Sequence, residues 1–280
     1  MPRFLLCLAL LAGCGENQTP LPDRPSYTAA DGGILECVPN LDGRIDADEM
    51  EAALGIPVSY LVSPGGTSRA VDLVGTVIDG QRVWDFGTDY ADDALIRLEA
   101  SAVDDQWFAG ELGLDRTDDL FTTPLDAAGT NLGVYRKTSE ALFLVAAVSA
   151  AGEPENQRTL LVYDSPIALY RYPMEVGATH VSTGTISGGT ALGLPYAGRD
   201  IYEVQVTSAG RIELPDLAFD QALRVDVKVT VEPAVGASTS RRQVSFLFEC
   251  FGEVARATSL PDETVVDFTT AAELRRLSLE

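Results

Sequence analysis

The side chains best suited to chemistry in this chain lie in a short segment that begins at Asn40. Asn40, Asp42, Asp46 and Glu49 all carry oxygen atoms that can bind a hard cation. Calcium takes about six to eight such ligands from carboxylates, amides and backbone carbonyls. The spacing therefore allows a weak calcium site made by Asn40, Asp42, the backbone carbonyl of Arg44, Asp46 and Glu49.

The same segment resembles the calcium loop of an EF-hand, whose sixth position is glycine and whose twelfth is glutamate. Gly43 and Glu49 stand at those positions. Val38 occupies the first position, where the motif usually has aspartate, so we expect a dissociation constant of about 10⁻⁴–10⁻³ M. The preferred interpretation is a calcium-free turn, in which Asp46 caps a short helix and Glu49 reaches back to it. No cofactor is therefore expected, and the weak calcium site is the alternative.

Other signs of catalysis are weak. His180 is the one histidine, so a Ser-His-Asp triad would have to use it. The segment Gly184–Gly188 has its serine at the wrong spacing for a nucleophile elbow. We therefore expect a protein that is not an enzyme. The alternative is a calcium-dependent hydrolase, which would need at least two Asp or Glu side chains converging in one cleft.

Charge and length exclude further classes of function. The 280 residues include 20 Lys plus Arg and 42 Asp plus Glu, which gives a formal net charge of -22. Such an acidic surface repels phosphate backbones, so nucleic acid is excluded as an expected partner. The length is sufficient for one large domain or two ordinary ones.

The N-terminus resembles the signal peptide of a bacterial lipoprotein. Arg3 precedes an apolar run from Phe4 to Leu11, and the sequence Leu11-Ala12-Gly13-Cys14 ends it. The resemblance implies removal of residues 1–13 and lipid attached to Cys14, with residues 14–27 as a polar tether. Gly15 is not the aspartate typical of inner-membrane retention, so the resemblance implies export and an anchor in the outer membrane.

Cysteine use follows from that interpretation. Cys7 would leave with the leader and Cys14 would carry the lipid, which leaves Cys37 and Cys250. In an oxidising compartment these two are expected to form a disulfide, the alternative being two free buried thiols. No CxxC pair occurs, so zinc is not expected.

Apolar and polar residues alternate along most of the remaining chain, as in Arg224–Val231, which predicts antiparallel strands. We expect a mostly β fold, with antiparallel sheets forming a sandwich or a half-open barrel. Short helices are predicted at Asp46–Leu54 and at Thr270–Leu279. The expected parts are residues 28–57 with the disulfide and the EF-hand-like loop, then an N-terminal β sub-domain over 58–165 and a C-terminal one over 166–280.

The mature chain as a whole resembles uncharacterised secreted lipoproteins of Gram-negative bacteria. These have a lipid-attachment cysteine, a calcium-type loop near a second cysteine and a long β-rich region. We expect a membrane-anchored envelope lipoprotein with a non-enzymatic binding or structural role. Its partners would be the membrane, through the lipid, and an envelope protein or an apolar ligand. An apolar cavity would support the ligand and a solid core would contradict it.

Overall fold

Strands form along nearly the whole described chain, some from alternating apolar and polar residues and one, Ala141–Ser149, from an almost unbroken apolar run. The computed structural model describes residues 37–279, except 51, 114–118 and 153. The leader, Cys14 and the tether lie outside the described residues. The strands are β1 (Pro57–Val62), β2 (Arg69–Ala70), β3 (Thr76–Ile78), β4 (Gln81–Asp85), β5 (Ala94–Glu99), β6 (Ser101–Ala102), β7 (Leu120–Pro124), β8 (Asn131–Lys137), β9 (Ala141–Ser149), β10 (Leu160–Arg171), β11 (Thr179–Ala191), β12 (Leu194–Glu213), β13 (Ala218–Pro233), β14 (Thr239–Phe248), β15 (Gly252–Ser259) and β16 (Thr270–Leu277).

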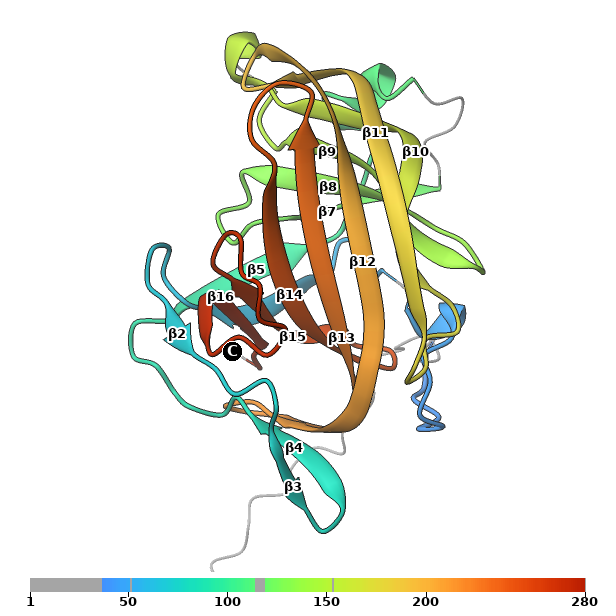
Figure 1. Ribbon diagram of the computed structural model, residues 1–280. Coiled ribbons are helices and arrows are strands. Elements are labelled where there is room, and N and C mark those ends of the chain that lie inside the picture. The colour runs from blue at the N-terminus through green and yellow to red at the C-terminus, as the bar shows by residue number, and fades with distance from the viewer. Residues whose placement is uncertain (1–36, 51, 114–118, 153, 280) are drawn as a thin grey trace, which may run out of the picture. The chain divides into compact units, whose positions relative to one another are not determined.

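All of these strands belong to one sheet (Figure 1). Its order is β5-β1-β16-β15-β14-β13-β12-β11-β10-β9-β8-β7-β6, with β2, β3 and β4 off this path. Neighbours on the path pair antiparallel, and β10 to β15 follow one another in chain order. The fold is therefore mostly β, as the alternation predicts.

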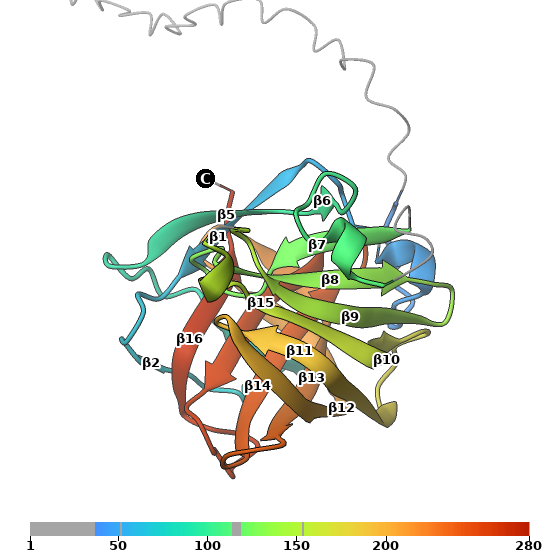
Figure 2. The same cartoon turned by 90° about the horizontal axis from the view of Figure 1, so that it is seen from above.

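One segment brings the two edges of the sheet together. β5 pairs with β1 at one edge, and β6 pairs with β7 at the other. Only Ala100 separates β5 from β6 in the sequence. The sheet consequently curls until it is nearly closed into a barrel, as the view from above shows (Figure 2).

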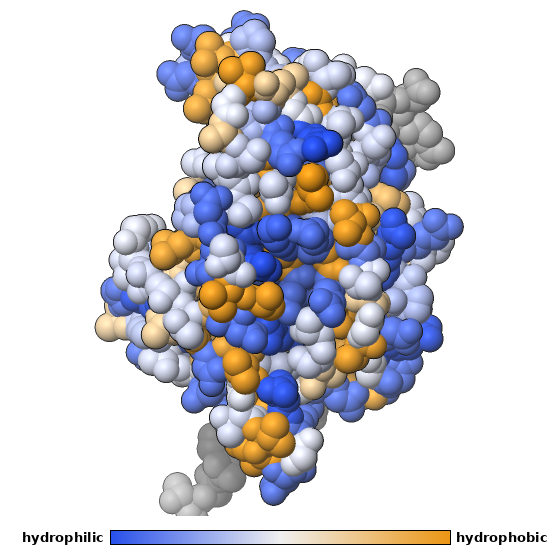
Figure 3. Space-filling model, viewed as in Figure 1, coloured by the Kyte–Doolittle hydropathy of each residue, from blue (hydrophilic) through white to orange (hydrophobic). Residues whose placement is uncertain are grey.

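The segment that contains β2, β3 and β4 covers the outer face of the sheet. Trp84 of β4 is fully buried, and its ring centroid lies 4.8 Å from that of Phe246 on β14. The β3–β4 hairpin turns at Asp79 and Gly80, both with positive φ, which is the geometry that an Asp-Gly hairpin turn requires. Apolar side chains gather on this exposed hairpin, which projects at the bottom of Figure 3.

A buried ion cluster fastens the end of that segment to the sheet. Arg69 of β2 and Arg276 of β16 both bond the carboxylate of Asp93, whose side chain is 1 % exposed. The ring of Tyr90 lies 4.4 Å from one guanidinium carbon and 5.2 Å from the other. We call Arg69, Tyr90, Asp93 and Arg276 the arginine clamp.

The structure differs from the sequence-based prediction in its helices. Thr270–Leu277 is a strand, because it fills the place between β1 and β15 and pairs with both. Of the helix expected over Asp46–Leu54, only the 3₁₀ helix η1 (Ala47–Glu49) forms, and two more 3₁₀ helices are η2 (Ala109–Glu111) and η3 (Glu155–Gln157). The predictions of a helix over Asp46–Leu54 and of another over Thr270–Leu279 were therefore wrong. A short segment with helical spacing is only marginally stable as an isolated helix, so pairing with neighbouring strands determines its structure here.

Pro166, where we expected two sub-domains to meet, lies inside β10. The pairing of β10 with β9 shifts register between Val162 and Ile167, so the strand accommodates the proline at an irregularity. The same sheet continues on both sides of it. None of the helices in the described part of the chain has the length and apolar character needed to cross a membrane.

Candidate binding cavity

The curled sheet forms a partly open cavity of about 980 Å³ on its inner face. Residues from β1, β5, β7 to β10 and β12 to β16 line it, so almost every strand of the ring contributes. Ligand sites in proteins commonly measure roughly 300–1,000 Å³. The interior is thus a cavity large enough for a small organic ligand.

One wall of the cavity is apolar because strand alternation places alternate side chains on the inner face. Along β13 these are Val227, Val229 and Val231. Leu142, Leu144 and Leu169 line the cavity from β9 and β10. A hydrocarbon chain that enters this part of the cavity leaves water, which favours binding by about 25 cal/mol for each Å² of apolar surface buried.

Four tyrosines bring hydroxyl groups into the same cavity: Tyr60, Tyr135, Tyr170 and Tyr202. Burial raises the pKa of each phenol, to about 12 for Tyr60. The four hydroxyls are therefore uncharged at neutral pH. Tyr135 also stacks on Phe121 with ring centroids 5.5 Å apart, which extends the aromatic surface of the wall.

The facing wall carries charged groups on two adjacent strands. Glu253 and Arg256 line the cavity from β15, and Glu273 and Arg275 line it from β16. Glu273 Oε1 lies 3.4 Å from Arg256 Nη2 and 3.3 Å from Arg275 Nη2. The cavity therefore combines hydrocarbon, hydroxyl groups and a buried ionic cluster, which is the chemistry of a site for an amphipathic molecule.

Sequence reasoning missed the ionic cluster. The expected helix over Thr270–Leu279 would have pointed Glu273 and Arg275 in different directions. In a strand, by contrast, residues two apart share a face. The spacing of Glu273, Arg275 and Leu277 was the available signal.

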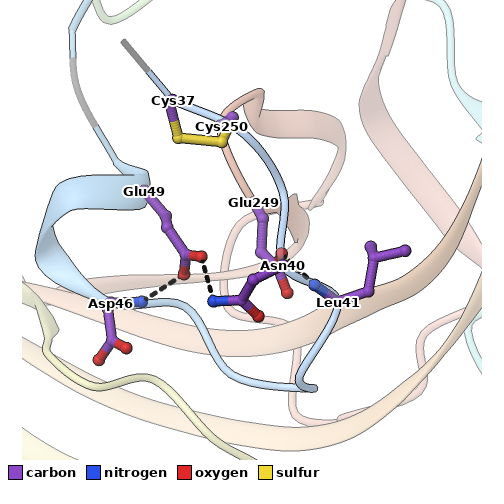
Figure 4. The surroundings of a disulfide bond; sticks show 7 residues. All are labelled: Cys37, Asn40, Leu41, Asp46, Glu49, Glu249 and Cys250. Atoms are coloured by element: carbon purple, nitrogen blue, oxygen red, sulfur yellow. Dashed lines mark hydrogen bonds between the residues drawn. A yellow bond between two sulfur atoms is a disulfide. The ribbon is translucent and has the colours of Figure 1, made fainter. Parts of the chain in front are cut away.

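A disulfide closes one end of this region. Cys37 and Cys250 are joined, with Cα atoms 5.6 Å apart, so the predicted disulfide is confirmed. It fastens the segment after Cys37 to the turn between β14 and β15, and Cys250 itself lines the cavity (Figure 4). Ile45 is buried and exchanges two backbone hydrogen bonds of 2.9 Å with Met174. The segment is thus held at both ends.

The oxygens of the calcium-type loop accept hydrogen bonds from donors within the protein, as Figure 4 shows for Glu49. Glu49 accepts bonds from the Asn40 amide at 2.8 Å and the Asp46 backbone N–H at 2.9 Å. Asp46 Oδ1 accepts from the Arg44 guanidinium at 2.6 Å, and Asp42 Oδ1 accepts from the Arg44 backbone N–H at 3.0 Å. In this arrangement the residues do not present a shared oxygen cage.

Buried carboxylates nevertheless lie close together there. Glu49 and Glu249 are both buried, and Glu249 accepts a 2.8 Å bond from the Leu41 backbone N–H. Burial, and then the charge of Glu249, raise the pKa of Glu49. Across the described residues, no group of three or more His, Cys, Asp or Glu side chains is placed to hold a metal. Calcium binding by this loop stays the alternative.

His180 lies away from the cavity lining. Its Nε2 is 3.0 Å from the carbonyl oxygen of Ala168 on β10, and burial lowers its pKa. Such a histidine is a satisfied residue of the sheet. The carboxylates Glu253 and Glu273 do line one cavity, but each already contacts a guanidinium.

Comparisons with protein-family models, with curated proteins and with solved structures find no match to this chain. The cavity and its side chains are therefore the features from which function can be inferred.

Proposed function

We propose that this protein is a non-enzymatic binding protein that takes an amphipathic ligand into the cavity inside its sheet. The observation that carries the proposal is the cavity of about 980 Å³, with an apolar wall facing an ionic cluster. A core that merely stabilised the fold would be filled, because protein interiors pack with few voids larger than a water molecule. A binding role also needs no nucleophile or general base.

Attachment to a membrane is part of the proposal. The sequence Leu11-Ala12-Gly13-Cys14 supports it by its resemblance to the processing site of bacterial lipoproteins. A lipid on Cys14 would hold a ligand-binding domain next to the bilayer, in the outer membrane of an envelope. Replacing Cys14 by serine should abolish incorporation of radiolabelled palmitate in cells. Unchanged incorporation would contradict lipid attachment at this residue.

Ligand binding can be tested with N-phenyl-1-naphthylamine, an uncharged fluorophore that brightens in apolar surroundings. We expect saturable binding by the protein. Val229→Trp places an indole in the cavity and should weaken this binding at least tenfold. Thr230→Trp is the matched control, because the next residue on a strand points to the opposite face. Equal binding by both variants would place the probe outside the cavity and contradict the proposal.

A hydrolase that uses carboxylates is the second candidate, favoured by the presence of Glu253 and Glu273 in one cavity. Its weakness is that Glu253 accepts a 2.8 Å hydrogen bond from Ser245, and Glu273 contacts two arginines. Carboxylates engaged in this way are poor general bases. Ester or glycoside hydrolysis that is lost in Glu273→Gln, with probe binding unchanged, would support this candidate.

A further inference from the structure

Two of the three arginines that line the cavity form an unusual pair. Arg256 on β15 and Arg275 on β16 are close cross-strand neighbours, because Arg256 pairs with Arg275 in the ladder register. Both side chains line the cavity, and their exposed fractions are 15 % and 4 %. Like charges placed opposite one another on adjacent strands destabilise a sheet. Keeping this pair in the interior lowers the stability of the fold, and packing alone does not explain why the pair is there.

The carboxylates of the protein satisfy this pair incompletely. Both guanidiniums contact the same oxygen, Glu273 Oε1, at 3.4 and 3.3 Å, and Arg256 lies 3.6 Å from Glu253. Charge-assisted hydrogen bonds are normally about 2.7–2.9 Å long. The Nε atoms of Arg256 and Arg275 are buried and have no hydrogen-bond partner among the described residues. Donors are therefore in excess on this wall.

The acceptors near the pair are already engaged. Glu253 accepts from the Ser245 hydroxyl at 2.8 Å, and its backbone carbonyl accepts from the Tyr60 hydroxyl at 3.0 Å. A cationic ligand would have to displace these donors. An anionic ligand would instead compete only with the long 3.4 and 3.3 Å contacts that the guanidinium Nη2 groups make with Glu273. Burial, and then the charge of Arg256, lower the pKa of Arg275, and a bound anion would oppose the second of these effects.

We infer that the ligand is a hydrocarbon-chain amphiphile with an anionic headgroup, a carboxylate or a phosphate, bound by Arg256 and Arg275. The inference rests on the proposed function, since it assigns a ligand class to the same cavity. The hydrocarbon chain lies against Val229, Leu142 and Leu169, and the headgroup oxygens accept from the two guanidiniums. Planar, bidentate recognition of this kind is what arginine provides and lysine does not.

The test displaces bound N-phenyl-1-naphthylamine with four twelve-carbon compounds that differ only in the headgroup. These are dodecanoate, dodecyl phosphate, dodecanol and dodecyltrimethylammonium, each used below its micelle concentration. We expect one or both anions to displace the probe at least tenfold more effectively than dodecanol, a difference of about 1.4 kcal/mol. The stronger anion identifies the headgroup as carboxylate or phosphate. Equal effectiveness of anions and alcohol, or preference for the ammonium compound, would overturn the inference.

Variants locate the headgroup. Arg275→Gln should remove most of the preference for anions while leaving the affinity for dodecanol within about twofold. Arg275→Lys keeps the charge and should restore only part of the preference. Arg97→Gln, at an exposed residue of β5 outside the cavity lining, is the matched control and should behave as the unmodified protein. An anion preference that survives in Arg275→Gln and in Arg256→Gln would overturn the assignment.

Failure of the proposed function gives a separate result. If the unmodified protein does not bind the uncharged probe, the binding cavity itself is refuted, whatever the headgroup. If the probe binds and all four compounds compete equally, the cavity stands and the headgroup inference is refuted. The four-compound series is measured on the unmodified protein, so this outcome does not depend on whether any variant folds.

Discussion

Removal of the disulfide between Cys37 and Cys250 is expected to destabilise the protein strongly. The bond joins residues 213 apart in the sequence. In the chain-entropy model, a closed loop of this length lowers the entropy of the unfolded chain enough to stabilise the fold by about 5 kcal/mol. Measured values are commonly about 2–4 kcal/mol. We therefore expect a loss of about 2–5 kcal/mol in the free energy of unfolding.

The assay is urea unfolding of the double variant Cys37→Ser/Cys250→Ser, followed by tryptophan fluorescence. With a slope of about 2 kcal/mol per M, the midpoint should fall by roughly 1–2.5 M. Chemical reduction of the unmodified protein should give the same midpoint as the double variant, which serves as the control for the serine side chains. A double variant with an unchanged midpoint would refute the reasoning from loop closure.

Three further predictions concern other parts of the molecule. Asp93→Asn leaves the two buried arginines of the clamp without their shared carboxylate and should cost about 3–5 kcal/mol in urea unfolding, whereas the exposed Asp92→Asn should cost under about 1 kcal/mol. Asp200 accepts a 2.5 Å hydrogen bond from Tyr163, and burial raises the pKa of its carboxyl group. The contribution of Asp200 to stability is therefore fully present below the pKa of the unfolded state and is lost as pH rises through the pKa of the folded state. The stability of the unmodified protein relative to Asp200→Asn should therefore increase as pH falls from 7 to 4, and a pH-independent difference would contradict this. Calcium titrated to several millimolar should leave the melting temperature as it is with chelator, because the loop oxygens already accept hydrogen bonds within the protein, whereas a rise that is lost in Asp42→Ala would establish a calcium site.

The sequence was sufficient for the fold class and the disulfide for clear physical reasons. Alternation along Arg224–Val231 has the period of a strand, and it became the middle of β13. The Asp79-Gly80 pair favours a tight hairpin turn by its residue types, and both residues adopt the positive φ that this turn requires. Cys37 and Cys250 were the pair left after Cys7 and Cys14 had been assigned to the leader and the lipid. The first two signals depend only on neighbouring residues, and the third depends only on the number of cysteines.

The cavity could not be predicted in the same way. Its lining depends on which strands become neighbours across the ring, and pairing between β1 and β16 joins residues from opposite ends of the chain. Glu273 and Arg275 are charged residues in a segment that also has helical spacing, so composition argued against placing them inside. Only the pairing of β16 with β15 brings Arg275 opposite Arg256 and Glu273 within contact of it. Non-local pairing therefore decides the site, and a single sequence does not encode it visibly.

Strand pairing is much shorter where the two edges of the sheet meet than elsewhere around the ring. β6 and β7 meet only through Ser101 opposite Thr122 and Ala102 opposite Phe121, whereas the β12–β13 ladder runs from Gly198 to Glu213. Amide hydrogens at this junction should exchange with solvent long before those of the ladder, because local opening there breaks few hydrogen bonds. Phe121 lies at the junction and also lines the cavity. Parting these two strands would widen the ring and shift an aromatic wall of the binding site, with the long ladders left intact.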